Sequence, residues 1–192
     1  MKMPSDTIYI QSAQVVGAGS MIELDWTEWA SQALVEGFNS KHLRMLAASS
    51  PDEHVVPLFA DLALAELNIP PVAWQDAKLT FVAQLLHRML SGKIEHEFAL
   101  EILRGLYLCH EDDETYKEFY YLREDYLYAR EGSFECCRLF DPSTENLEKV
   151  VDDFARKWLI ANNLSQETWA IWTLILKRQL DNAREIEINK KI

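Results

Sequence analysis

The chain has 192 residues, of which 48% are apolar and 11% aromatic, and its formal net charge at pH 7 is −12. This length suits one folded domain or two very small ones, and the apolar content argues against a disordered chain. Binding to a phosphate backbone or an anionic membrane surface needs positive charge, so we expect neither nucleic acid nor a membrane as partner. No apolar run approaches the roughly 18 residues that a transmembrane helix needs.

The first two dozen residues carry the weakest helical signals. Thr7-Ile8-Tyr9-Ile10 favours β structure, and Gly17-Ala18-Gly19-Ser20 offers a turn. Residues 1–24 are therefore expected to form either a short β-hairpin or a loose arm. Asp25 with Glu28 then gives an N-terminal capping pattern, and we expect residues 25–192 to form a single α-helical domain.

Further helix signals follow in chain order. Ser40 is a capping residue for a short helix, and Ser50-Pro51 indicates the start of another. Pro57 complicates that second helix and shifts the expected start toward His54. After Pro70-Pro71, apolar residues recur at helical spacing between 77 and 90, and again between 98 and 106.

Helix signals of the same kind occur in the C-terminal half. A helix is expected from about Asp113 to Glu131, stopped by Gly132, followed by an irregular stretch. Asp141 or Ser143 then caps a helix through Leu159, and a last helix follows residue 165. Seven or eight helices with short loops predict an all-α fold, an irregular bundle of antiparallel-paired helices.

The number and spacing of the cysteines indicate the cellular compartment. Cys109, Cys136 and Cys137 are odd in number and contain no C-x-x-C, which indicates reduced thiols and a cytoplasmic protein. The phosphate-binding loop and the dinucleotide fingerprint are both absent. These absences count against an enzyme but do not exclude one, because catalysis can be built from scattered residues.

A metal-binding or hydrolytic site is one alternative, built from Glu95, His96, Glu97, Glu101 and His110. Carboxylate and imidazole groups ligate metals and exchange protons. Neither the E-x-x-H of di-metal bundles nor H-E-x-x-H occurs, and the P-C-x-x-C of zinc deaminases is missing. We assign no catalytic residue and no metal ligand, and a non-enzyme is the favoured interpretation.

The helix after Asp113 is the most informative element. Residues 95–135 hold twelve acidic and four basic side chains, a net charge of −8. At 100° per residue, one side of the helix is expected to face the core. That side carries Tyr116, Phe119, Tyr120, Leu122, Tyr126 and Leu127. Two tyrosines and four acids fall on the other side: Glu114, Glu118, Tyr121, Glu124, Asp125 and Tyr128.

Two interpretations of that outer face stay open. Tyrosine is amphipathic and neighbouring helices can cover it, in which case the face has no role in binding. Alternatively, the acids attract a basic partner and the tyrosines anchor it, because tyrosine is enriched at interface hot spots.

Residues 91–132 resemble a helix-pair pattern in small uncharacterised bacterial helical proteins, some of which look like immunity proteins of toxin systems. Gly92 and Ile94 introduce one helix, and Phe119 and Leu122 lie in the acidic helix that follows. The resemblance implies a bacterial binding protein without a cofactor, and it carries over no catalytic residue.

Three functional hypotheses follow. The first is an acidic protein-binding module, an immunity protein that occludes a basic toxin. The second is the metal-binding or hydrolytic bundle above. The third is a homo-oligomeric structural protein whose self-interface is a tryptophan-rich surface near Trp26 and Trp29.

Overall fold

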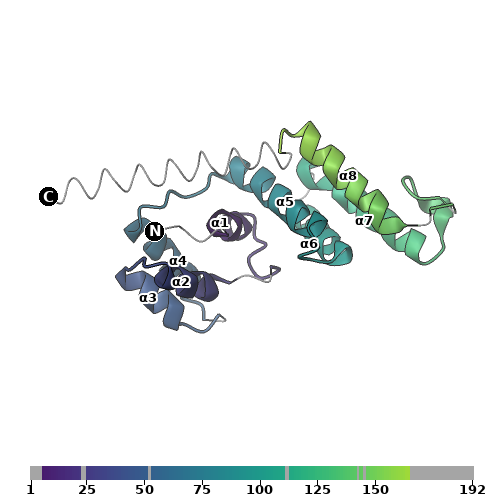
Figure 1. Ribbon diagram of the computed structural model, residues 1–192. Coiled ribbons are helices and arrows are strands. Elements are labelled where there is room, and N and C mark those ends of the chain that lie inside the picture. Colours follow the sequence, from purple (N-terminus) through teal and green to yellow (C-terminus); the bar gives the residue numbers. More distant parts are fainter. Residues whose placement is uncertain are drawn as a thin grey trace. The chain divides into compact units, whose positions relative to one another are not determined.

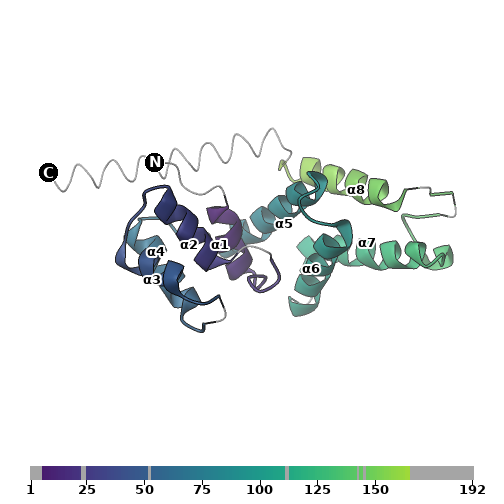
Figure 2. The same ribbon diagram turned by 60° about the horizontal axis from the view of Figure 1, so that its bottom comes forward.

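The computed structural model describes residues 6–22, 25–51, 53–110, 113–141, 143–144 and 146–164. These residues form eight α-helices and one short 3-10 helix, and no strand occurs among them, so the chain is all-α as predicted (Figures 1 and 2). No helix in these ranges combines the length and apolar character needed to cross a bilayer.

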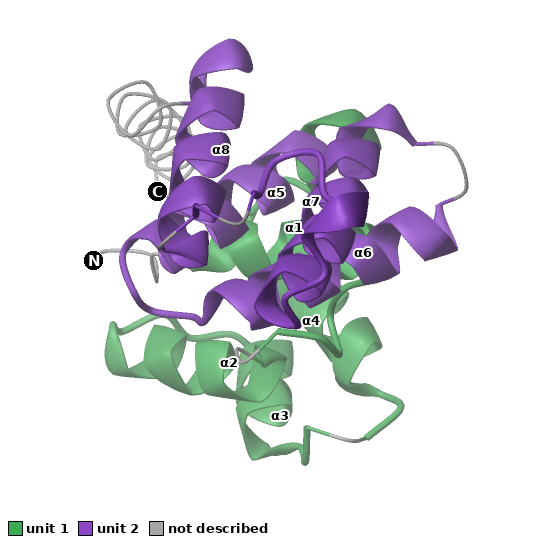
Figure 3. Cartoon of the chain, turned by 90° about the vertical axis from the view of Figure 1, so that its right-hand side faces the viewer, with its two compact units in different colours: residues 1–77, 170–192 green, residues 78–169 purple. Residues whose placement is uncertain are grey.

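The described residues divide into two compact units, coloured separately in Figure 3. Residues 6–77 belong to the first unit and residues 78–164 to the second. The predicted limits at 1–24 and 25–192 stay a prediction.

The first unit contains α1 (Thr7–Val15), α2 (Trp26–Val35), α3 (Lys41–Ala48) and α4 (Val56–Glu66). One buried apolar cluster joins all four helices, with members such as Ile10, Ala30, Leu43 and Ala60. Helix α3 packs against both α2 and α4.

The β-hairpin or loose arm expected for residues 1–24 is wrong at Thr7–Val15, because this stretch is helical. Tyr9, Ile10, Ala13 and Val16 are all buried, at the three- and four-residue spacing of one helix face. Burial of that face against the neighbouring helices outweighs the weak β preference of the local sequence.

Local caps explain where the helices of the first unit begin. The Asp25 carboxylate accepts hydrogen bonds from the backbone N–H groups of Thr27 and Glu28, both at 2.7 Å. The Ser40 hydroxyl accepts from the N–H of Leu43 at 3.2 Å. Helix α4 begins at Val56, close to the start expected near His54 and well after Ser50, because Pro57 fits only in the first turn.

The two tryptophans of α2 are core residues. Trp26 and Trp29 are 7% and 3% exposed and pack edge to face, with ring centroids 5.2 Å apart. The indole N–H of Trp29 also donates to the Thr7 hydroxyl at 2.8 Å. The expected tryptophan-rich surface is therefore wrong, and a self-interface cannot rest on these residues.

The second unit contains most of α5 (Trp74–Leu90), then α6 (His96–Cys109), α7 (Glu114–Arg130), η1 (Phe134–Cys136) and α8 (Leu147–Ala161). Phe81, Leu85 and Met89 of α5 are buried, as their spacing predicted. Helix α8 contacts α7 through Phe119, whose ring centroid lies 5.7 Å from that of Phe154 and 5.3 Å from that of Trp158.

Two expectations about the end of the chain have different outcomes. Helix α8 is capped by Asn146, whose side chain accepts from the N–H of Lys149 at 2.9 Å, so the cap predicted at Asp141 or Ser143 is wrong. Asp141 instead accepts from the N–H of Ser143, which closes a local turn. The helix expected after residue 165 lies outside the described residues.

Candidate interaction surface on helices α6 and α7

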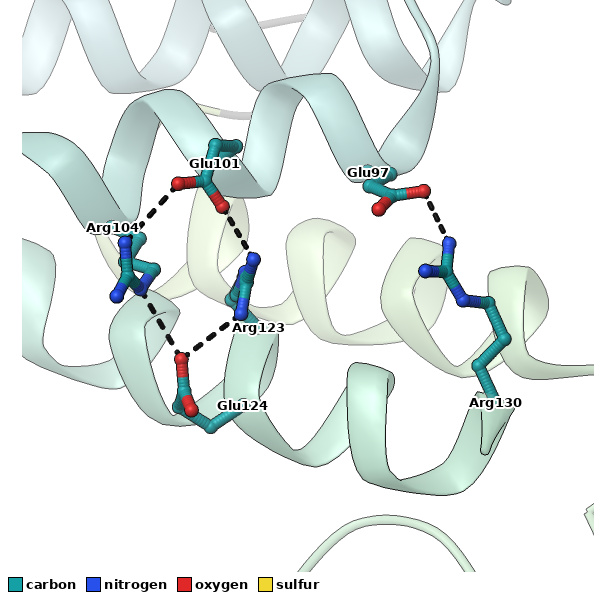
Figure 4. Close-up of polar contacts among 6 residues, drawn as sticks. All are labelled: Glu97, Glu101, Arg104, Arg123, Glu124 and Arg130. Atoms are coloured by element: carbon teal, nitrogen blue, oxygen red, sulfur yellow. Dashed lines mark hydrogen bonds and ion pairs between the residues drawn. The ribbon is translucent and has the colours of Figure 1, made fainter. Parts of the chain in front are cut away.

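Helices α6 and α7 pack as an antiparallel pair, and Figure 4 shows the side chains that connect them. Their direction follows from the contacts: residues 97, 101, 104 and 107 of α6 meet residues 130, 123, 124 and 120 of α7. Residue numbers rise along α6, whereas the numbers of the α7 residues that they contact broadly fall, so the two helices run in opposite directions. One continuous line of side-chain pairs therefore runs along the seam between the helices.

The start of α7 is fixed by Asp113. Its carboxylate accepts from the N–H of Thr115 at 3.0 Å and pairs with the Lys78 ammonium of α5 at 2.7 Å. Burial alone would raise the pKa of Asp113, but the hydrogen bonds from Lys78 and Thr115 hold it below its ordinary value. Asp113 is thus a cap and an inter-helix contact, and it takes no part in a metal site among the described residues.

The middle of the seam is a closed ring of two acids and two arginines (Figure 4). Glu101 contacts Arg123 at 2.7 Å and Arg104 at 3.2 Å. Glu124 contacts the same two guanidinium groups, each at 3.2 Å. The ring is electrically neutral, so these acids add little to an acidic surface and chiefly join α6 to α7.

Figure 4 also shows a second cross-helix pair nearer the start of α6, between Glu97 and Arg130. The Glu97 carboxylate raises the pKa of Arg130 through this hydrogen bond. Both side chains are about half exposed, so this pair is screened by solvent and contributes little stability.

At the other end of the seam lies a cluster of three tyrosines: Tyr107, Tyr120 and Tyr121. The rings of Tyr107 and Tyr120 have centroids 4.8 Å apart, and those of Tyr120 and Tyr121 have centroids 5.4 Å apart. All three side chains are only partly buried. This tyrosine cluster presents aromatic surface on two rigid helices.

Asp125 does not lie on the outer face, and that part of the prediction is wrong. The residue is 5% exposed. Its carboxylate accepts from the backbone N–H groups of Arg138 at 2.8 Å and Leu139 at 3.3 Å. The segment after η1 therefore covers α7 at this point, which helix periodicity alone cannot reveal.

The anchored segment brings Arg138 over the ring of Tyr121, with 4.1 Å from the guanidinium carbon to the ring centroid. The Cys137 thiol adds a further contact and donates to the backbone carbonyl of Asp125 at 3.4 Å. Tyr121 is thus half-buried, with the Arg138 guanidinium over its ring and the Tyr120 ring packed against it in a T-shaped arrangement.

The six residues predicted for partner binding separate into three groups. Glu114, Glu118 and Tyr128 are exposed. Glu114 pairs with Lys117 at 2.8 Å, and Glu118 has no partner among the described residues. Tyr121 and Glu124 are half-buried by the contacts above, and Asp125 is internal.

The residues of the metal-binding alternative do not converge. His96 contacts Asp152 of α8 at 2.9 Å, whereas Glu97 and Glu101 pair with arginines. His110 lies beside the Tyr116 ring, with centroids 6.1 Å apart. No group of three or more His, Cys, Asp or Glu side chains in the described ranges is placed to hold a metal ion.

Neither a family model, nor a curated protein, nor a solved structure matches this chain. The resemblance of residues 91–132 to small bacterial helical proteins stays a prediction.

Three residues of this surface were not predicted: Tyr107, Tyr120 and Arg138. Tyr120 was expected in the core, because at 100° per residue it falls near Tyr116 and Phe119. Tyr107 lies one turn after Arg104 on α6 and follows the seam, so pairing the two helices antiparallel could have found it. No local signal places Arg138.

Proposed function

We propose that this chain is a non-enzymatic protein-binding module whose contact surface is the tyrosine cluster of α6 and α7 together with the exposed side chains Glu114, Glu118 and Tyr128. The proposed partner is a basic protein. The observation that carries the proposal is the cluster itself: three partly exposed tyrosines, in which Tyr120 packs against both Tyr107 and Tyr121, held on a helix pair that ion pairs join.

The physical basis is the low entropic cost of such a surface. Tyrosine supplies large contact area with few rotatable bonds, and rings that already pack on one another lose little freedom on binding. Acids at the edge of an aromatic patch speed the approach of a basic partner. Glu114 and Glu118 lie one helical turn apart on α7 and are exposed, so they suit that role.

The specific form that we propose is a bacterial immunity protein that neutralises a basic toxin by occlusion. The net charge of −8 over residues 95–135 complements a surface that binds phosphate groups. Occlusion needs no catalytic group and no cofactor in this chain. The three free thiols are consistent with a cytoplasmic setting, which is part of the proposal.

Affinity capture from a lysate of the native host at low salt tests the proposal. The immobilised full chain is compared with a Tyr121→Ala/Tyr128→Ala variant and with a Glu28→Gln/Asp61→Asn control, which changes exposed acids of the first unit. We expect one basic protein, retained by the wild type and the control and lost with the tyrosine variant. Equal retention by all three proteins would exclude this surface, and capture of nothing would count against a protein-binding module.

A further inference from the structure

Arg138 and Tyr121 form a cation–π contact. The Arg138 side chain is exposed, and among the described residues no carboxylate lies within ion-pairing distance of its guanidinium group. Its guanidinium carbon lies 4.1 Å from the centroid of the Tyr121 ring. An exposed cation–π contact is worth only about 0.5–1 kcal/mol, so another cation can displace this one.

The backbone that carries Arg138 is held independently of its side chain. The Asp125 carboxylate binds the N–H groups of Arg138 and Leu139, and the Cys137 thiol binds the carbonyl of Asp125. Removing the Arg138 side chain therefore uncovers the Tyr121 ring without releasing the segment from α7.

We infer that the Tyr121 ring is a binding site for an arginine side chain of the partner protein, and that Arg138 occupies this site in the free chain. The inference rests on the proposed function and adds the chemistry of the partner's contact residue. Guanidinium groups stack on aromatic faces more readily than ammonium groups, and the acidic segment 95–135 favours a cationic occupant. Displacing Arg138 exposes its guanidinium group to solvent and leaves the Tyr121 ring packed against Tyr120.

The test uses the full chain and two peptides of equal charge, nona-arginine and nona-lysine, with affinities measured by calorimetry. If Arg138 blocks the ring with about 0.5–1 kcal/mol, Arg138→Ala should tighten nona-arginine binding about three- to six-fold. Nona-lysine should change less. In a Tyr121→Leu background, the gain from Arg138→Ala should disappear.

Loss of a positive charge must be separated from loss of the stacked group. Lys149→Ala is the matched control, because it removes one exposed charge from α8 in the same unit. Circular dichroism of each variant checks that the helices are retained. The inference is overturned if Arg138→Ala has no larger effect than Lys149→Ala, or if its gain persists without the Tyr121 ring.

These results are separable from a failure of the proposed function. The peptide titration needs no natural partner, whereas the capture experiment needs no knowledge of Arg138. If a captured protein binds Arg138→Ala and Tyr121→Leu with unchanged affinity, the chain is still a protein-binding module, but the Tyr121 ring is not an arginine site.

Discussion

Asp125 determines which part of the α7 face is open to a partner, because its carboxylate holds the segment after η1 against the helix. From the sequence it belongs with Glu118, Tyr121 and Tyr128, because spacings of three, four and seven residues place all of them on one side of α7. In the fold its carboxylate satisfies two backbone N–H groups of the segment after η1. It therefore supports the surface from within and is not available to a partner.

Replacing Asp125 by alanine should cost about 1–3 kcal/mol of unfolding free energy, because two backbone donors lose their acceptor. Asp125→Asn keeps one acceptor oxygen and should cost less. Urea unfolding measures both variants, and amide exchange at Arg138 and Leu139 locates the effect. Protection of those two amides that is unchanged in Asp125→Ala would contradict the anchoring role.

Glu66 is the corresponding residue in the first unit, where it joins α4 to the start of α3. The Ser40 hydroxyl and the backbone N–H of His42 lower the pKa of Glu66 from 4.5 to about 2. The carboxylate also contacts the His42 ring nitrogen Nδ1 at 2.6 Å. Glu66 thus acts as a second cap on α3, supplied by another helix.

Because its pKa is lower in the folded chain, ionised Glu66 stabilises the fold above about pH 4.5, and this contribution is lost as the pH falls toward 2. We expect Glu66→Gln to reduce the loss of stability across that window. Chemical unfolding between pH 2 and pH 6 tests this, with Asp61→Asn on the same helix as control. Parallel pH profiles for wild type and Glu66→Gln would exclude the role.

At the scale of elements, local signals predicted most of the helices, whereas the contacts between helices were not predicted. Asp25 and Ser40 cap the helices that they were predicted to cap, because a cap depends on the next three residues alone. The cap predicted at Asp141 or Ser143 is instead Asn146. Helix α1 was missed because burial of Ile10 and Ala13, not local preference, decides its conformation. The charge of the α7 face was overestimated, since its neutralising Arg104 comes from α6.

The ring of Glu101, Arg104, Arg123 and Glu124 should join α6 and α7 with modest energy, because its members are partly exposed. A double-mutant cycle on Glu101→Gln and Arg123→Gln should give a coupling of about 0.5–1 kcal/mol that falls in 1 M salt. Glu114→Gln with Arg130→Gln, at opposite ends of α7, is the control pair and should be additive. Zero coupling in the ring pair would leave the α6–α7 association to apolar packing.

At the scale of the whole molecule, the helix signals along the chain predicted the all-α class, and the eight helices of the described residues confirm it. The net charge of −12 underlies the proposal of a basic partner. The candidate surface could be predicted only in part, because Tyr121, Tyr128 and the acids of α7 follow from one helix, whereas Tyr107 and Arg138 come from other elements. The contacts of such residues are set by packing across the second unit, which the spacing within α7 does not encode.

We propose that the acids of the α6–α7 surface speed association with the partner, whereas its tyrosines slow dissociation. The most direct measurement is the association and dissociation rate of the captured partner for Glu114→Gln/Glu118→Gln and for Tyr121→Ala, across a range of salt concentrations. The acid variant should associate several-fold more slowly at low salt, and the difference should fade near about 0.5 M salt, where charges are screened. The tyrosine variant should dissociate faster at every salt concentration. Rates that change no more than those of the Glu28→Gln/Asp61→Asn control would contradict the account.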